Sequence, residues 1–133
     1  MERPLNGAGR DAAVAAARAT IGLDLLILFG SRARGEARPG ADWDFGYVAD
    51  ETADISGLLA CLVEAIEDDH VDLVDLRRAG GLLRYRAACD GLLVYEATVG
   101  RFDQYRLQAA QFWCDNAPVF ERGYEEVLEA LRP

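Results

Sequence analysis

The stretch of sequence that decides the fold is GSRARGEARPGADWDF, which occupies residues 30–45. It follows the apolar run LLILF at residues 25–29, which predicts a strand buried on both faces and ending in a Gly-Ser turn. The next strand, at residues 43–49, alternates aromatic residues with small or acidic ones, which predicts aromatic side chains on its core-facing side. Asp42 and Asp44 are then expected to project together from the opposite side.

Further helices and strands are expected before and after these two strands. Aliphatic residues recur at helical spacing between residues 55 and 66, and the alanine-rich residues 10–21 are typical of a first helix. The full set comprises helices at about residues 10–21, 55–66, 79–90, 101–116 and 119–131, and strands at about residues 25–29, 43–49, 71–76 and 92–95. The sequence therefore predicts an α+β (α/β) fold, a small mixed β-sheet backed by helices.

The last two helices are expected to be separated at Asn116-Ala117-Pro118, because proline interrupts a helix. We expect the first of them to bury Phe102, Tyr105, Ala109, Phe112 and Trp113, and the second to bury Tyr124, Val127, Leu128 and Leu131. At this length, residues 1–133 are expected to form a single domain. Its core lies at about residues 20–96, with a C-terminal helical extension at about residues 101–131.

Composition and charge narrow the class of protein. The formal net charge of −9 argues against non-specific binding to duplex nucleic acid, because such binding needs Lys and Arg to neutralise phosphates. The acidic excess suits a protein that holds a cation or docks on a basic partner. Three widely spaced cysteines fit neither a disulfide framework nor a zinc site. With no leader and no membrane-spanning apolar run, we expect a cytoplasmic protein.

The Gly-Ser turn is a candidate phosphate-binding element. Gly30 permits a close backbone approach, and Ser31 offers a hydroxyl and a backbone N–H at an expected helix start, where amides favour anions. The simpler interpretation is that Ser31 only caps this turn. Arg32 and Arg34 are placed to neutralise a triphosphate or its leaving pyrophosphate, although Arg34 is equally well explained as an exposed surface residue. We assign Gly30, Ser31 and Arg32 as nucleotide-binding residues.

The paired aspartates are candidate metal ligands. Asp42 and Asp44 are expected to lie about 6 to 7 Å apart along one strand face, where a divalent cation such as Mg²⁺ would offset their repulsion. An isolated Asp-x-Asp pair is more often solvated, but the Gly-Ser turn favours a metal site. Asp72 or Asp75 could supply a third carboxylate as general base and ligand for a second metal. They face opposite sides of their strand, so only one can join, and this pattern alone leaves the choice open.

The string GSRARGEARPGADWDF, followed by VDLVDL, resembles the minimal nucleotidyltransferase (MNT) family of the DNA polymerase β-like superfamily. The family signature is Gly-Ser, ten residues, then Asp-x-Asp, and Gly30, Ser31, Asp42 and Asp44 match it. The resemblance covers about residues 20–96 and implies a polymerase β-like fold. It also selects Asp72 as the third catalytic and metal-binding aspartate. Ala41, where the family often has serine, and Trp43, in place of an aliphatic residue, depart from the pattern without removing a ligand.

The resemblance implies transfer of AMP from ATP to a hydroxyl with Mg²⁺, two ions being expected, and release of pyrophosphate. Many short members are antitoxins of HEPN/MNT toxin–antitoxin pairs, and some add AMP to a tyrosine of the HEPN RNase toxin.

Two other functions stay open. The chain could mask a basic toxin without catalysis, as its charge of −9 would allow. It could also modify a small molecule such as an antibiotic. The single histidine, His70, has no Ser, Cys or second His at a suggestive spacing and is expected at the surface.

Overall fold

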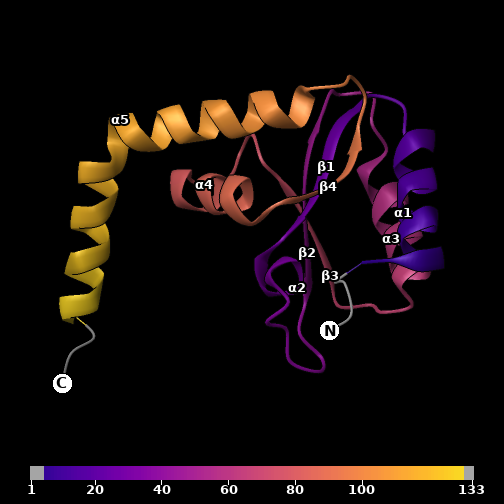
Figure 1. Ribbon diagram of the computed structural model, residues 1–133, viewed down its shortest axis with the longest axis horizontal. Helices are drawn as coiled ribbons and strands as arrows, with labels where there is room; N and C mark the ends of the chain where they lie inside the picture. Colours follow the sequence, from indigo (N-terminus) through magenta and orange to yellow (C-terminus); the bar gives the residue numbers. More distant parts are fainter. Residues whose placement is uncertain (1–4, 131–133) are drawn as a thin grey trace.

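The computed structural model describes the backbone of residues 5–130 and the side chains of residues 5–116, and it contains a four-stranded sheet with helices on both faces (Figure 1). In chain order the elements are α1 (Gly7–Ala19), β1 (Leu23–Phe29), α2 (Gly30–Arg34), β2 (Trp43–Ala49), α3 (Ile55–Ile66), β3 (Val71–Asp75), α4 (Gly81–Asp90), β4 (Leu92–Glu96) and α5 (Arg101–Ala130). The expected α+β fold with a mixed sheet is confirmed.

The sheet has the strand order β3-β2-β1-β4. β1 pairs antiparallel with both β2 and β4, whereas β2 and β3 are parallel and are joined through α3. A parallel pair needs such a crossover because its two strands run in the same direction. The register places Phe29, the last residue of β1, opposite Asp44 on β2, and Asp44 opposite Asp72 on β3. The end of β1 and two acidic residues therefore meet at one place on the sheet.

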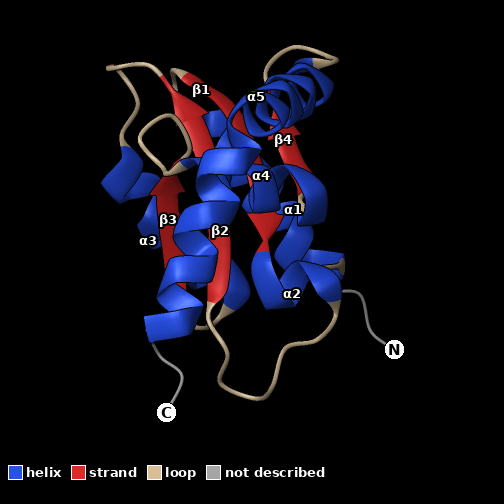
Figure 2. Ribbon diagram, turned by 90° about the vertical axis from the view of Figure 1, so that its left-hand side faces the viewer, coloured by secondary structure: helices blue, strands red, loops and turns tan. Residues whose placement is uncertain are grey.

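Helices cover both faces of the sheet, and each face has its own hydrophobic cluster. α1 and α3 lie against one face and α4 and the first part of α5 against the other, as Figures 1 and 2 show. Alternating residues of β1 enter the two clusters: Leu26 and Leu28 face α1 and α3, whereas Leu25 and Ile27 face α4 and α5. All four side chains are buried, which confirms the strand expected to be buried on both faces. The aromatic residues of β2 likewise pack in the α1–α3 cluster.

The C-terminal helix, α5, differs from the two helices that were expected. The break expected at residues 116–118 is absent: the structure has one helix, Arg101–Ala130, which bends part-way along (Figure 1). Pro118 has no backbone N–H, so it removes a single bond to the carbonyl of Cys114, and a helix can continue through such a site with a kink. Within the described part of the chain, no helix is both long and apolar enough to cross a membrane.

The burial expected along α5 is confirmed only in part. Phe102, Tyr105 and Ala109 are buried against α4 and the sheet, but Phe112 is 38% exposed. The guanidinium of Arg84, on α4, lies 5.3 Å from the ring centroid of Phe112. Trp113 is half-buried and stacks on Tyr85. The other expected core positions, Tyr124, Val127, Leu128 and Leu131, lie outside the described side chains.

Candidate functional site

The turn after β1 brings the backbone against an acidic side chain. Gly30 begins α2 with φ +75°, a left-handed conformation that residues with a side chain rarely adopt. A Cβ atom at this position would lie 2.5 Å from Oδ2 of Asp44. Both the backbone conformation and the neighbouring carboxylate therefore require glycine at this position. The next residue, Ser31, is half-buried in the same turn.

The three predicted acidic residues gather at this end of the sheet. Asp44 is half-buried on β2, Asp72 is its register partner on β3, and the exposed Asp42 immediately precedes β2. Burial raises the pKa of the Asp44 carboxyl above its usual value, and the negative charges of Asp72 and Asp42 raise it further, while Arg34 opposes the shift. Carboxylates grouped around one acid in this way offer the oxygen ligands that a divalent cation prefers.

Asp75 lies on the other side of β3. Its register partner is Tyr47, whose ring belongs to the α1–α3 cluster. The Oδ1 atom of Asp75 accepts a hydrogen bond of 2.9 Å from the backbone N–H of Arg77, so this carboxylate closes the turn after β3. Of the two candidates for a third carboxylate, only Asp72 shares a sheet face with Asp44.

A cleft of about 650 Å³ opens beside the Gly-Ser turn. Its wall combines three kinds of group: a carboxylate close to the Gly-Ser turn, cationic side chains, and apolar side chains. The lining residues are Phe29, Gly30, Ser31, Arg34, Asp44, Leu82, Leu83, Arg86 and Asp90. Such a mixture suits a ligand that carries both charged and apolar parts.

The two arginines of α2 have different surroundings. Arg32 donates from Nε and Nη2 to the carbonyl oxygen of Ala41, at 3.3 and 2.9 Å, and its guanidinium lies 4.6 Å from the ring centroid of Trp43. It thereby fastens α2 to the residues before β2. Arg34, in contrast, lines the cleft with Asp44. The predicted nucleotide-binding role of Arg32 stays a prediction, and Arg34 is the α2 arginine that lines the cleft.

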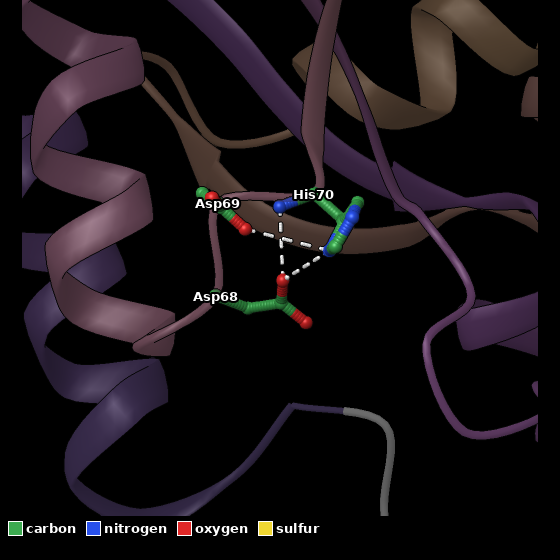
Figure 3. A group of neighbouring side chains, drawn as sticks. All are labelled: Asp68, Asp69 and His70. Atoms are coloured by element: carbon green, nitrogen blue, oxygen red, sulfur yellow. Dashed lines mark hydrogen bonds and ion pairs between the residues drawn. The ribbon is translucent and has the colours of Figure 1, made fainter.

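A second acidic group lies at the entrance to β3 (Figure 3). Asp68, Asp69 and His70 each place a ligand atom within 4.8 Å of the others, a mutual separation that Asp42, Asp44 and Asp72 do not reach in the described part of the chain. Asp68 accepts hydrogen bonds from the backbone N–H of His70, 2.9 Å, and pairs with its ring Nδ1, 3.1 Å. These carboxylates raise the pKa of His70. His70 is exposed, as expected, and the group fixes the turn before β3.

The contribution of α4 to this site was not predicted from the sequence. Arg86 and Asp90 line the cleft, and Asp90 pairs with Arg34 through Nη1 and Oδ2 at 2.9 Å. Their spacing of four residues places both on one face of the helix, which was a signal available in the sequence. What the sequence lacked was the information that this face of α4 turns toward α2.

Comparison with known proteins gives the family. Residues 16–98 match the family described as Polymerase beta, Nucleotidyltransferase. Over 97 residues the chain is 32% identical to the protein adenylyltransferase MntA of Aphanizomenon flos-aquae (strain 2012/KM1/D3). That match covers 63% of this chain and spans only 64% of the length of that curated relative.

Solved structures of similar shape include a toxin–antitoxin complex with AMP-PNP, with a TM-score of 0.72, 24% identity and coverage of 90% of this chain and 98% of that one. Another is the tri-AMPylated Shewanella oneidensis HEPN toxin in complex with an MNT antitoxin, with a TM-score of 0.68, 22% identity and coverage of 90% and 96%. At these identities the likeness establishes the fold, which is the expected polymerase β-like one. Because the family match covers more than half of its length, this chain belongs to the polymerase β nucleotidyltransferase family.

Proposed function

We propose that this chain is a cytoplasmic antitoxin that transfers AMP from ATP to a tyrosine hydroxyl of a HEPN-domain toxin, with Mg²⁺ as cofactor. The observation that carries the proposal is the position of Asp44, which lies against the turn at Gly30, pairs in register with Asp72 and is repelled by the charges of Asp72 and Asp42. The identity with a protein adenylyltransferase supports the reaction. The similar folds solved with AMP-PNP and with a HEPN toxin support the nucleotide and the partner.

The acidic residues fit Mg²⁺ by the chemistry of their donors. Asp42, Asp44 and Asp72 offer carboxylate oxygens, the ligands that Mg²⁺ prefers. Burial, and then the charges of Asp72 and Asp42, raise the pKa of Asp44, and a bound cation would offset that repulsion. We assign all three as metal ligands and expect two ions to be held. When bound, Mg²⁺ would neutralise charge on the triphosphate and orient it.

The remaining residues would bind the nucleotide and move one proton. The turn at Gly30 and Ser31, with Arg32 close by, would receive the phosphates. Asp72 would accept the proton of the attacking tyrosine hydroxyl, whose oxygen forms a bond to the α-phosphorus. The bond between the α-phosphorus and the oxygen that bridges to the β-phosphate breaks, and pyrophosphate leaves. Catalysis would rest mainly on positioning and electrostatic stabilisation.

We also propose that residues 1–133 form one nucleotidyltransferase domain, with its core at about residues 20–96. Two observations support it. Ala13 and Ala17 of α1 lie in the cluster on one face of the sheet, and Phe102 and Tyr105 of α5 lie in the cluster on the other. The helices on either side of the core therefore complete its two hydrophobic layers.

Mass spectrometry of a HEPN toxin tests the proposed reaction. The toxin is incubated with the chain, ATP and Mg²⁺, and we expect a tyrosine to gain one or more AMP groups.

The charge of −9 favours a second candidate, an antitoxin that only masks its toxin. A variant carrying both Asp42→Ala and Asp44→Ala separates the two, because masking alone would leave protection intact. A toxin that is protected without any adduct would reject the proposed transfer, and turnover of aminoglycosides instead would indicate a small-molecule enzyme.

Replacing the two aspartates of β3 in turn tests the choice of the third carboxylate. We expect Asp72→Asn to lower AMP transfer on the order of 10²–10³-fold, because it removes the proposed base and a metal ligand. Asp75→Asn keeps an oxygen that accepts from the N–H of Arg77, so its transfer rate should stay within about twofold of the parent. The measurement is the initial rate of adduct formation. A slow Asp75→Asn beside a normal Asp72→Asn would reverse the assignment.

A further inference from the structure

α4 brings two charged residues to the cleft from one helix face. Arg86 is exposed and Asp90 is half-buried, and they are separated by one helical turn. Both line the cleft with Asp44, Gly30 and Ser31. α4 covers the sheet face opposite to α1 and α3 (Figure 1), so its cleft-lining residues approach the Gly-Ser turn from the side opposite those helices.

Asp90 holds the guanidinium of Arg34. Its Oδ2 lies 2.9 Å from Nη1 of Arg34, and its side chain is 24% exposed against 39% for the arginine. Glu36, 67% exposed, takes the Nε side of the same guanidinium at 3.0 Å. A guanidinium has five N–H donors in a fixed plane, so two carboxylates can set its orientation and still leave donors for another anion.

Arg86 has no such carboxylate partner among the described side chains. An arginine and an aspartate four residues apart on a helix commonly pair, yet the carboxylate of Asp90 pairs with Arg34 instead. Among the side chains that the structure describes, Arg86 forms no ion pair. The cleft therefore holds one arginine fixed by carboxylates and a second that forms no ion pair with a described side chain, in a chain of net charge −9.

We propose that Arg86 binds the terminal phosphates of the nucleoside triphosphate together with Arg34, and that Asp90 is the positioning residue that holds Arg34 for this purpose. The inference rests on the proposed function and adds the part of the site that distinguishes a triphosphate from a monophosphate. The acidic residues around Asp44 repel a polyanion, so cationic side chains of the same cleft would help to hold it. Planar guanidinium groups match phosphate oxygens in geometry as well as in charge.

Binding of a non-hydrolysable ATP analogue and of AMP to the full chain tests the role of Arg86. With Mg²⁺ present, titration calorimetry of Arg86→Ala should show about tenfold weaker binding of the analogue, equivalent to about 1.4 kcal/mol, and AMP binding within about twofold of the parent. Arg86→Lys should recover part of the loss. Arg38→Ala is the matched control: it removes an equal charge from the exposed loop after α2, outside the cleft lining, and should leave both ligands unchanged.

A double-substitution cycle tests the role of Asp90. Asp90→Ala should weaken binding of the ATP analogue several-fold, whereas Asp90→Asn retains an acceptor oxygen for Arg34 and should stay within about twofold of the parent. Because Asp90 acts through Arg34, adding Asp90→Ala to Arg34→Ala should produce no further loss. A full additional loss in that background would overturn the positioning role.

The outcomes separate this inference from the proposed function. The assignment of Arg86 is wrong, and the transfer reaction stands, if the parent chain binds the analogue and Arg86→Ala binds it equally well. The same holds if Arg86→Ala weakens binding of AMP as much as binding of the analogue. If the parent chain binds no ATP analogue with Mg²⁺, the proposed function itself fails. Circular dichroism of each variant tests whether the substitution leaves the fold intact.

Discussion

Asparagine at position 44 is expected to abolish AMP transfer and at the same time make the free chain more resistant to heat. Asp44 is the acid whose charge interacts with both Asp42 and Asp72, and it is a proposed metal ligand. Asp44→Asn should therefore slow transfer on the order of 10³-fold. The same substitution removes a half-buried charge that Asp42 and Asp72 repel, and we expect the melting temperature at pH 8 to rise by a few degrees. Stability and activity are thus opposed at this residue.

The pH dependence of that stability has a definite sign. Folding raises the pKa of Asp44 above the value of 3.8 that it has when unfolded, so the protonated side chain favours the folded state and ionisation disfavours it. The stabilising contribution is complete below pH 3.8 and is lost as the pH rises through the folded pKa. The melting temperature of Asp44→Asn should therefore exceed that of the parent chain by more at pH 8 than at pH 4.

Thermal melts between pH 4 and pH 8, with AMP transfer measured on the same samples, check both parts. Asp11→Asn on the exposed surface of α1 is the matched control and should change neither the melting temperature nor the rate. An Asp44→Asn chain that melts below the parent at pH 8, or that still transfers AMP at a similar rate, would contradict the account of this residue.

A methyl group at Gly30 is expected to damage the site far more than the fold. Gly30→Ala places a Cβ atom 2.5 Å from Oδ2 of Asp44, so the carboxylate must move. A displacement on the order of 1 Å at a reacting centre can lower a rate about 10²-fold, and we expect a loss of that size in AMP transfer. The left-handed backbone conformation adds about 1–2 kcal/mol of destabilisation.

Gly40→Ala separates these two effects. Gly40 also has a positive φ, +82°, but a Cβ atom there would have nothing within 4 Å. It should therefore share the loss of stability measured by urea unfolding and keep its transfer rate within about twofold. Equal transfer rates for the two alanine variants would show that the contact between Gly30 and Asp44 is without consequence.

The parts of the fold that could be predicted from sequence are those in which the polarity of each residue indicates whether it is buried or exposed. The continuous apolar residues of β1 and the alternation along β2 identified both strands, and the latter was predicted with its observed bounds, Trp43–Ala49. Alternation also placed Asp72 and Asp75 on opposite sides of β3. It could not say which side faces Asp44, because that depends on the register between two strands.

The features that could not be predicted depend on packing between distant segments. Pro118 predicted a break, whereas the α5 backbone continues through it, since the loss of one hydrogen bond does not end a long helix. Asp90 was overlooked because its partner, Arg34, lies more than fifty residues earlier in the chain. Arg86 was overlooked because the cleft that it lines is formed with the equally distant Gly-Ser turn. Nothing local to α4 indicates that neighbour.

A crystal structure of the chain grown with Mn²⁺ and a non-hydrolysable ATP analogue tests the central claim most directly. Anomalous scattering locates manganese without reference to the protein density. The account predicts manganese bound by carboxylate oxygens of Asp42, Asp44 and Asp72, with the triphosphate against the backbone at Gly30 and Ser31. Nucleotide and metal bound elsewhere on the chain, with these three aspartates making no contact to manganese, would contradict it.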